Sequence, residues 1–224
     1  PSSGEACNTL GIYLHGPLVP SATHLNASPA ADGSVPPPAQ GIVSRDIEYY
    51  LQGAASDPSI KGLILDVDSH GGGVVAGEEI ALAILRFGKP TVSVIRELGA
   101  SSGYLAAAAA EMVFASANSS VGSISVTQSY ADYAKQNERE GVTYNVLSTG
   151  IFKDAGAADK ALTAEERAIF MRDLRTLHDH FVATIAELRN LPLEEVQKIA
   201  DGSTVLGEQA KALGDLSENA EYHE

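Results

Sequence analysis

The alternation of short apolar β runs with helical stretches most constrains what this chain can fold into. The predicted strands are residues 9–15, 62–68, 91–95, 112–115, 121–126 and 142–147, and the predicted helices between them are 42–54, 75–87 and 101–110. Consecutive parallel strands need a crossover of a dozen or more residues, usually a helix. Because strands and helices alternate here, we predict an α/β protein with a mainly parallel sheet.

The last third of the chain has a helical pattern. Thr163 and Glu166 have the spacing of a capping box, in which each side chain bonds a free amide of the first helical turn. Apolar residues then recur at spacings of three and four, which predicts a long amphipathic helix. Shorter helices are expected at 192–200 and 208–213. We therefore expect one domain over 1–224, with a helical C-terminal segment at 163–214.

Residues 17–40 differ in composition from the rest of the chain. They hold six of the ten prolines and, apart from His24, a single ionisable side chain, Asp32. Successive prolines favour extended polyproline II, so we predict a long mobile connector. Long loops in compact domains are often functional, and a lid over a substrate groove is the alternative to a plain surface loop.

The charge of the chain excludes several classes of partner. With 15 basic and 29 acidic residues, the formal net charge is −14. Nucleic acids and anionic lipid headgroups are bound through basic surfaces, so we expect neither as a partner. The sequence has no run of 18 uncharged apolar residues and starts without Met, so we expect a soluble domain whose upstream segment has been removed. Cys7 is the single cysteine, which excludes an intramolecular disulfide.

Three glycine-containing junctions follow predicted strands and could carry chemistry. The first is 68–73 (DSHGGG), whose glycines either let the backbone approach a ligand closely or form a plain tight turn. The second, 99–104 (GASSGY), places serines between a strand and a helix, as in a nucleophile elbow or a helix cap. The third is 148–154 (STGIFKD). A serine nucleophile needs a base, and of the six histidines only His70 lies at such a junction.

Four motifs, taken in their order along the chain, identify a resemblance. Residues 68–73, 100–104, 121–124 and 150–154 together resemble the signal peptide peptidase A family, Ser-Lys serine proteases of the Clp/crotonase superfamily. The resemblance covers residues 10–216, and four ordered motifs are far more specific than any one of them. It implies a fold of stacked β-β-α units followed by a C-terminal helical segment.

The resemblance also implies roles for individual residues. By position, Ser101 matches the nucleophile and Lys153 the general base, and Ser123 matches a residue that orients this lysine. The groups that match the oxyanion hole are the amides of Ser102 and of Gly71 or Gly72.

The chain departs from the family pattern at four positions. The family commonly has Pro at position 70 and Gly at 102 and 125, where this chain has His70, Ser102 and Ser125. Ser102 leaves the choice of nucleophile between two adjacent serines, and His70 could alter the substrate groove. Position 151 is often a second lysine in the family, and Ile151 leaves Lys153 as the one lysine of its motif.

The residues around the matched positions bear on the protonation of Lys153. A lysine accepts a proton only as a neutral amine, and desolvation favours that form. Residues 99–131 contain one acid, Glu111, and no basic residue, as a dry site requires. The negative net charge and the adjacent Asp154 favour the ammonium form instead. If residues 152–154 are extended, Asp154 points away from Lys153.

The function implied by the resemblance is a serine endopeptidase that degrades membrane-derived peptides, such as cleaved signal peptides or unfolded segments. It implies no metal and no organic cofactor, and a ring-shaped homo-oligomer with sites shared between protomers. It also implies a membrane anchor absent from this chain, with the domain outside the cytoplasmic membrane in a periplasmic or extracellular space. The alternatives are a phage-type capsid-maturation protease, a catalytically silent assembly or binding module on the same scaffold, and, disfavoured by the acidic composition, a crotonase-type acyl-CoA enzyme.

Overall fold

The computed structural model describes residues 8–22, 41–214 and 218–219, which form two compact units. Unit 1 is built from the chain up to Ser125 and from Phe181 onward, and unit 2 is built from Val126–His180. A single domain over 1–224 stays a prediction. Most of the predicted connector, residues 23–40, lies outside the described residues, but its start at 18–19 is not a mobile connector, because Leu18 is fully buried and pairs with Ile42.

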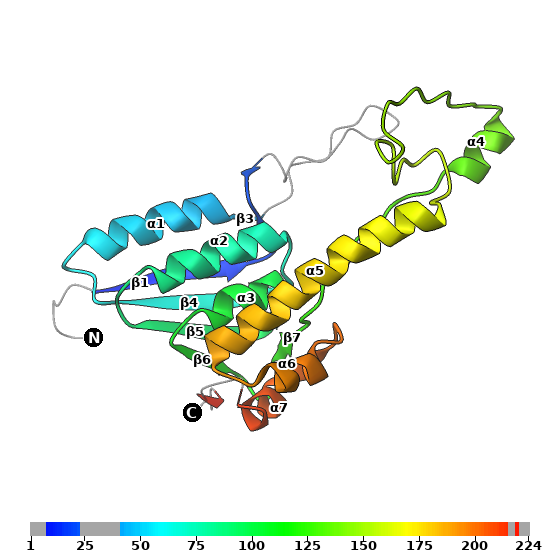
Figure 1. Ribbon diagram of the computed structural model, residues 1–224. Coiled ribbons are helices and arrows are strands. Elements are labelled where there is room, and N and C mark those ends of the chain that lie inside the picture. Colours follow the sequence, from blue (N-terminus) through cyan, green and yellow to red (C-terminus); the bar gives the residue numbers. More distant parts are fainter. Residues whose placement is uncertain (1–7, 23–40, 215–217, 220–224) are drawn as a thin grey trace. The chain divides into compact units, whose positions relative to one another are not determined.

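Unit 1 contains the predicted, mainly parallel sheet (Figure 1). Its main path is β1 (Thr9–His15), β4 (Gly62–Ser69), β5 (Thr91–Ala100), β6 (Met112–Ala115) and β9 (Glu218–Asn219), with all neighbours parallel. The remaining strands are β7 (Ser120–Gly122), parallel to the second half of β5, and β8 (Thr204–Leu206), antiparallel to β7. Side chains at alternate positions of β4, from Leu63 to Ser69, are buried, which is the period of two expected of a strand with one face in the core.

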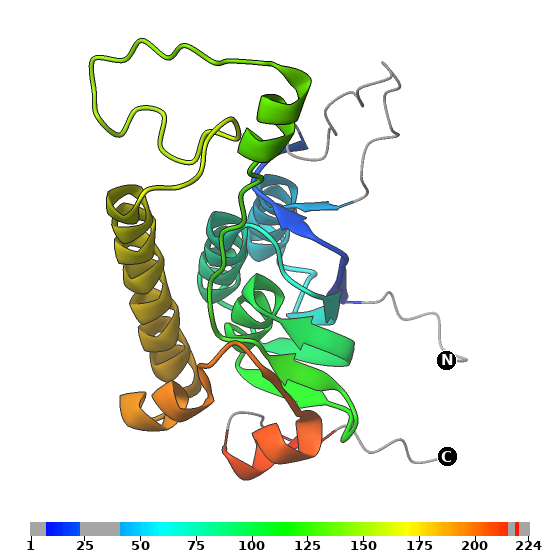
Figure 2. The ribbon, with the colours of Figure 1, turned by 90° about the vertical axis from the view of Figure 1, so that its right-hand side faces the viewer.

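Helices cover one face of this sheet (Figure 2). They are α1 (Ser44–Ser56), α2 (Val74–Leu85) and α3 (Ser102–Ala108). Every residue of α3 is buried, and its alanines allow the close packing that places the end of β5 in the core of the unit. A separate parallel pair, β2 (Leu18–Val19) and β3 (Ile42–Val43), precedes α1. The strand and helix order confirms the predicted α/β class.

The helices of the last third are present as predicted. α5 (Ala164–Arg189) begins in unit 2 and continues into unit 1, and α6 (Leu193–Ile199) and α7 (Gly207–Ala212) follow it. The predicted capping box opens α5. The Glu166 N–H donates to Thr163 Oγ1 at 3.2 Å, and the Thr163 N–H donates to Glu166 Oε2 at 2.9 Å.

Two parts of unit 2 differ from the prediction. Residues 142–147, expected to be a strand, have no regular secondary structure although the structure describes all of them. Their side chains are all exposed, and a strand requires a neighbour that accepts its ladder hydrogen bonds. The helix α4 (Ala134–Glu140) was not expected, because it buries no residue and therefore has no apolar period in the sequence.

Candidate active site

Ser101 lies at a sharp turn between β5 and α3. Its φ is 53°, in the left-handed region that non-glycine residues rarely adopt. Two backbone hydrogen bonds hold the turn: the Ser101 N–H donates to the Gly122 carbonyl at 2.8 Å, and the Leu105 N–H donates to the Ser101 carbonyl at 3.0 Å. The Ser101 side chain makes no capping hydrogen bond to α3. A strained serine between a strand and a helix is the geometry of a nucleophile elbow, so the structure favours that interpretation over a helix cap.

The glycine junction after β4 lies directly against this turn. Gly71 has a φ of 92°, and a methyl carbon placed on it would lie 2.8 Å from Ser101 Cβ and 2.9 Å from the Ser102 nitrogen. Gly72, with a φ of 152°, approaches Leu18 equally closely, and a methyl carbon there would lie 2.3 Å from the Leu18 carbonyl oxygen. Glycine is therefore required at both positions: a side chain on Gly71 would displace the backbone beside Ser101, and one on Gly72 would displace the backbone of Leu18.

Hydrogen bonds distinguish the two candidate amides of this junction. The Gly71 N–H donates to Ser69 Oγ at 3.1 Å, and that hydroxyl donates to the Gly16 carbonyl at 2.6 Å. Leu18 pairs with the flanking groups: its N–H donates to the Gly71 carbonyl, and its carbonyl accepts from the Gly73 N–H. The Gly72 N–H takes part in none of these bonds. The geometry therefore favours Gly72 as the donor to an oxyanion, with Gly71 fixing its position.

Ser102 and Ser101 differ in accessibility. Ser102 is 3% exposed, and a methyl carbon on Gly77 of α2 would lie 2.6 Å from its Cβ. The Ser102 hydroxyl has no hydrogen-bond partner among the residues that the structure describes. Ser101 is half-buried instead. Of the two adjacent serines, Ser101 is therefore the one whose hydroxyl a substrate could reach, and Ser102 offers its backbone amide.

Ser123 follows β7 and belongs to the same part of unit 1, one residue after the carbonyl that holds Ser101. Its φ is also 53°, its N–H donates to the Ser203 carbonyl at 2.9 Å, and its Oγ donates to the Gly202 carbonyl at 3.0 Å. Since the hydroxyl proton is used in this bond, the lone pairs of Oγ are left to accept a hydrogen bond. An amine is the kind of group that could donate it.

Lys153 lies in unit 2, so the sequence-predicted site residues are divided between the two units. Its side chain is exposed, and its backbone N–H donates to the Gly150 carbonyl at 3.0 Å. Residues 151–156 form turns, so the condition under which Asp154 would point away from Lys153, an extended 152–154, is not met. A tight turn removes the alternation that was expected to point Asp154 away from Lys153.

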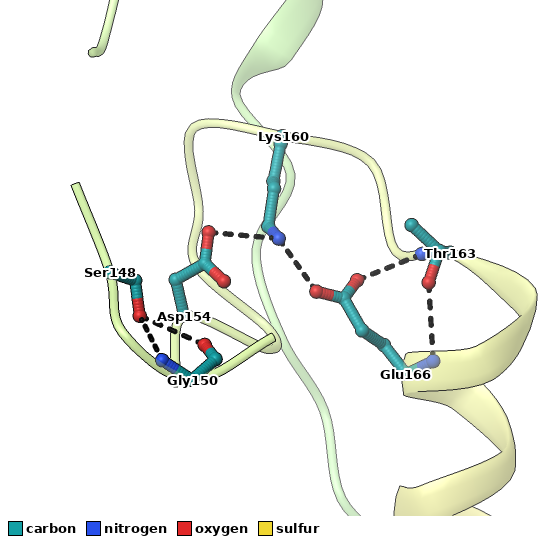
Figure 3. Close-up of polar contacts among 6 residues, drawn as sticks. All are labelled: Ser148, Gly150, Asp154, Lys160, Thr163 and Glu166. Atoms are coloured by element: carbon teal, nitrogen blue, oxygen red, sulfur yellow. Dashed lines mark hydrogen bonds and ion pairs between the residues drawn. The ribbon is translucent and has the colours of Figure 1, made fainter. Parts of the chain in front are cut away.

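Asp154 is held by an ion pair instead (Figure 3). Lys160 Nζ lies 3.0 Å from Asp154 Oδ2 and 2.6 Å from Glu166 Oε1. The hydrogen bond from Lys160 holds the pKa of the Asp154 carboxyl below its ordinary value, and the same ammonium lowers the pKa of Glu166. Asp154 therefore stays ionised and paired at neutral pH.

Sequence reasoning missed Ser69 and Lys160. Ser69 did carry a signal, since it is the one polar residue among the alternate inward positions of β4. Lys160 carried none, because its partners come together only through the turns of unit 2. His70, the alternative base, is exposed beside Gly71.

Within the described part of the chain, no group of three or more His, Cys, Asp or Glu side chains is arranged to hold a metal ion. No helix in the described ranges combines the length and apolar character needed to cross a membrane.

Comparisons with known proteins bear on the family of the chain. The sequence pattern of the family described as Peptidase family S49 matches residues 83–223. A Methanocaldococcus jannaschii protein that carries the name of a protease is 34% identical over 78% of this chain and 58% of its own length. A protein of Enterococcus faecium named as a signal peptide peptidase is 31% identical over 73% of this chain and 48% of its own length. The chain thus spans about half the length of these relatives.

A phage protein and a solved structure add to the comparison. The capsid assembly protease C of phage lambda is 28% identical over 70% of this chain and 35% of its own length. A ClpP1 mutant from Listeria monocytogenes has a TM-score of 0.58 at 18% identity, and the match covers 96% of this chain and 92% of that chain. The fold is therefore Clp-like, as the sequence motifs implied.

Proposed function

The chain belongs to peptidase family S49, and we propose that it is a serine endopeptidase with a Ser-Lys dyad, in which Ser101 is the nucleophile and Lys153 the general base. The observation that carries this proposal is the strained Ser101 turn held against Gly71, next to the Gly72 amide, which donates to none of the residues that the structure describes. Ser101 and Lys153 lie in different units, so their pairing belongs to the proposal.

The proposed chemistry is acyl transfer to a serine. Ser101 Oγ attacks the scissile carbonyl while the neutral Lys153 amine takes its proton. The Gly72 and Ser102 amides donate to the oxyanion, and the tetrahedral intermediate collapses as the lysine returns the proton to the leaving amine. Water, deprotonated in turn by Lys153, then attacks the acyl carbonyl, and the lysine returns the proton to Ser101 Oγ as the acid product leaves. Ser123 accepts a hydrogen bond from the amine and orients it, because its own proton is donated to Gly202.

The proposed substrates are apolar peptides, chiefly segments derived from membranes such as cleaved signal peptides. Leu147, Ile151 and Phe152, which precede Lys153, are 99%, 85% and 41% exposed. Exposed apolar side chains in such number usually mark a surface that another chain covers. A domain associated with a membrane through another part of the protein, on its periplasmic or extracellular side, would meet such peptides.

The proposed assembly is a ring-shaped homo-oligomer in which neighbouring protomers complete each site. An exposed lysine is surrounded by water, which favours its ammonium form. Burial of Lys153 against a neighbouring protomer would supply the desolvation that a general base needs. The negative net charge makes this contribution more important, because it favours the ammonium form everywhere on the molecule.

Substitution of the dyad tests the function directly. Ser101→Ala and Lys153→Ala are each expected to lower kcat/KM on an unfolded casein substrate by roughly a thousandfold or more, since nucleophile and base act as a unit. Ser102→Ala is the matched control, and we expect it to keep both activity and labelling by a fluorophosphonate probe. Loss of labelling in Ser102→Ala with normal labelling in Ser101→Ala would move the nucleophile by one residue.

Two alternative functions would use the same fold but give different experimental results. The phage lambda relative favours a capsid-maturation protease as the second candidate, and mass spectrometry of the cut sites would distinguish it by cleavage of a single scaffold or capsid protein. A catalytically silent module would show no fluorophosphonate labelling of Ser101 at any pH.

A further inference from the structure

We infer that Asp201 is a positioning residue: it orients the peptide group whose carbonyl oxygen accepts the hydroxyl proton of Ser123. That peptide group joins Gly202 to Ser203. The inference rests on the proposed function, in which Ser123 orients the base, and adds a residue to it. All the contacts that carry it lie within unit 1.

Asp201 opens an exposed turn between α6 and β8. One of its carboxylate oxygens, Oδ1, accepts from the Ser203 N–H at 2.8 Å and from the Ser203 hydroxyl at 2.6 Å. The bond from this hydroxyl, followed by that from the N–H, lowers the pKa of the Asp201 carboxyl below its ordinary value. The carboxyl is therefore ionised at neutral pH and holds Ser203 as an acceptor alone.

One peptide group carries this contact to Ser123. The Ser203 N–H and the Gly202 carbonyl belong to the same planar unit. Because Asp201 holds the N–H, the carbonyl has a fixed direction, and it accepts from Ser123 Oγ at 3.0 Å. The next carbonyl, that of Ser203, accepts from the Ser123 N–H at 2.9 Å. The turn therefore fixes both the backbone and the hydroxyl of Ser123.

Ser123 needs this support because its backbone is strained. Residues other than glycine rarely adopt its φ of 53°, and such a conformation persists only where surrounding contacts hold it. The preceding residue, Gly122, supplies the carbonyl that accepts from the Ser101 N–H at 2.8 Å. Relaxation of Ser123 would therefore also shift the carbonyl that holds the turn of the proposed nucleophile.

Gly202 lets the turn lie close to the segment that carries Ser123. Its φ is 91°, and a methyl carbon placed on it would lie 3.2 Å from Ser125 Cβ. The turn and the residues after β7 are thus in direct contact, so a displacement of the 202–203 peptide group would be transmitted to Ser123.

A second turn of the described chain makes the same two hydrogen bonds away from the site. It lies before β4, whereas the glycine junction follows the other end of that strand. Asp57 Oδ1 accepts from the Ser59 N–H at 2.8 Å and from the Ser59 hydroxyl at 2.7 Å, and both side chains are exposed. The carbonyl of the intervening Pro58 accepts from the ammonium of Lys61. Asp57→Ala is therefore the matched control for Asp201→Ala.

The test combines steady-state kinetics on unfolded casein with hydrogen exchange of the Ser123 N–H, both on the full chain. We expect Asp201→Ala to lower kcat by roughly ten- to a hundredfold at unchanged KM, since a misplaced group near the chemistry is this costly. Exchange of the Ser123 N–H should become faster. Asp201→Asn keeps an oxygen that can accept both bonds and should restore kcat and exchange, and Asp57→Ala should leave both at their wild-type values.

A double-mutant cycle with Ser123→Ala separates positioning from a purely structural role. If Asp201 acts through the Ser123 hydroxyl, Asp201→Ala should lower kcat far less in the Ser123→Ala background. An equal factor in both backgrounds, or unchanged exchange of the Ser123 N–H, would show that the inference is wrong.

Two further outcomes have a defined meaning. Should Asp201→Ala fail to fold, Asp201→Glu decides, because its longer side chain displaces the carboxylate from the Ser203 N–H; a wild-type kcat in Asp201→Glu would overturn the inference. A wild-type chain without peptidase activity would contradict the proposed function, while hydrogen exchange would still test whether Asp201 holds Ser123.

Discussion

The contact between Gly71 and Ser101 sets the geometry of the candidate site at the scale of single residues. We predict that Gly71→Ala abolishes peptidase activity and lowers the free energy of unfolding by about 1–3 kcal/mol. The added methyl carbon would lie 2.8 Å from Ser101 Cβ on a backbone with a φ of 92°. Activity and urea unfolding of the same preparation check the two effects.

Gly53→Ala is the matched control for this substitution. Gly53 lies within α1, and no heavy atom lies within 4 Å of a methyl carbon placed on it. Alanine is favoured over glycine in a helix by about 1 kcal/mol, so this variant should keep its activity and gain stability. Equal losses of activity and stability in Gly71→Ala and Gly53→Ala would show that the close contact between Gly71 and Ser101 does not cause the effect.

Ser69 is the second residue that fixes the glycine loop 71–73 beside Ser101. Ser69→Ala removes the hydroxyl that joins the Gly71 N–H to the Gly16 carbonyl, and it leaves both backbone groups without this partner. We expect a loss of stability of about 1–3 kcal/mol and a fall in kcat with little change in KM. Steady-state kinetics and thermal unfolding measure these effects. An unchanged kcat would mean that the position of Gly72 does not depend on this hydroxyl.

Asp66 on β4 gives unit 1 a pH-dependent contribution to stability. The Arg96 guanidinium, and to a lesser extent His15, hold the pKa of the Asp66 carboxyl below its ordinary value. The stabilisation is therefore complete above the unfolded-state pKa of about 3.9 and is lost as the pH falls through the lower folded value. Asp66→Asn should cost about 1 kcal/mol at pH 7, and the difference from wild type should shrink below pH 4. Urea unfolding at several pH values tests this, and a difference that grows toward acid would contradict it.

At the scale of elements, the capping box decides where α5 begins. Thr163→Ala removes the acceptor of the Glu166 N–H and should lower stability by about 1 kcal/mol. Thr163→Ser keeps the hydroxyl and is the control. Hydrogen exchange of the first turn of α5 would show the loss locally, and equal exchange in the two variants would exclude a capping role.

The strands and helices that could be predicted are those in which the spacing of apolar residues matches the side chains that are buried. The strands predicted at 9–15 and 112–115 coincide with β1 and β6. β5 runs beyond its predicted end at 95 to Ala100, because its second half pairs with β7, a long-range contact without a local signal. Residues 142–147 alternate like a strand but pair with no strand in the described part of the chain, so the same pattern gave a wrong prediction there.

Part of the candidate site could likewise be predicted from the sequence, and part could not. The order of motifs singled out Ser101, Gly71, Gly72 and Ser102, and the structure brings these residues together at one end of the sheet. Local sequence did not separate Gly71 from Gly72 or Ser101 from Ser102, because burial and hydrogen bonding make those distinctions. The side of the chain on which Asp154 lies was open in the sequence, because it depends on whether 152–154 are extended, and the structure has a turn there.

At the scale of the whole molecule, unit 1 has one sheet face that its own helices leave uncovered (Figure 2). Tyr13, Ile64 and Met112 are 68%, 44% and 44% exposed on the sheet strands. Mainly parallel sheets are normally covered on both faces. This agrees with the proposed homo-oligomer, in which another protomer supplies the cover.

Subunit mixing tests whether protomers share sites. We predict that inactive Ser101→Ala and Lys153→Ala chains, mixed under conditions of verified subunit exchange, regain activity at about one site in four, since a random equal mixture pairs intact partners at that frequency. Ser101→Ala chains alone, taken through the same exchange conditions, serve as the blank. Continued silence of the mixed chains would show that serine and lysine come from the same protomer.

The chain leaves unit 1 after Ser125 and returns to it at Phe181, so unit 2 is one continuous insertion. Ser101, its glycine loop and Ser123 are encoded on one side of the insertion, whereas Lys153 is encoded within it. An exchange of the insertion alone would therefore leave the strained serine intact while it replaces Lys153, the proposed proton acceptor. Descendants of such an exchange would keep the architecture of a peptidase without its turnover, and a protein engineer could use the same boundary to graft a new base onto an unchanged nucleophile.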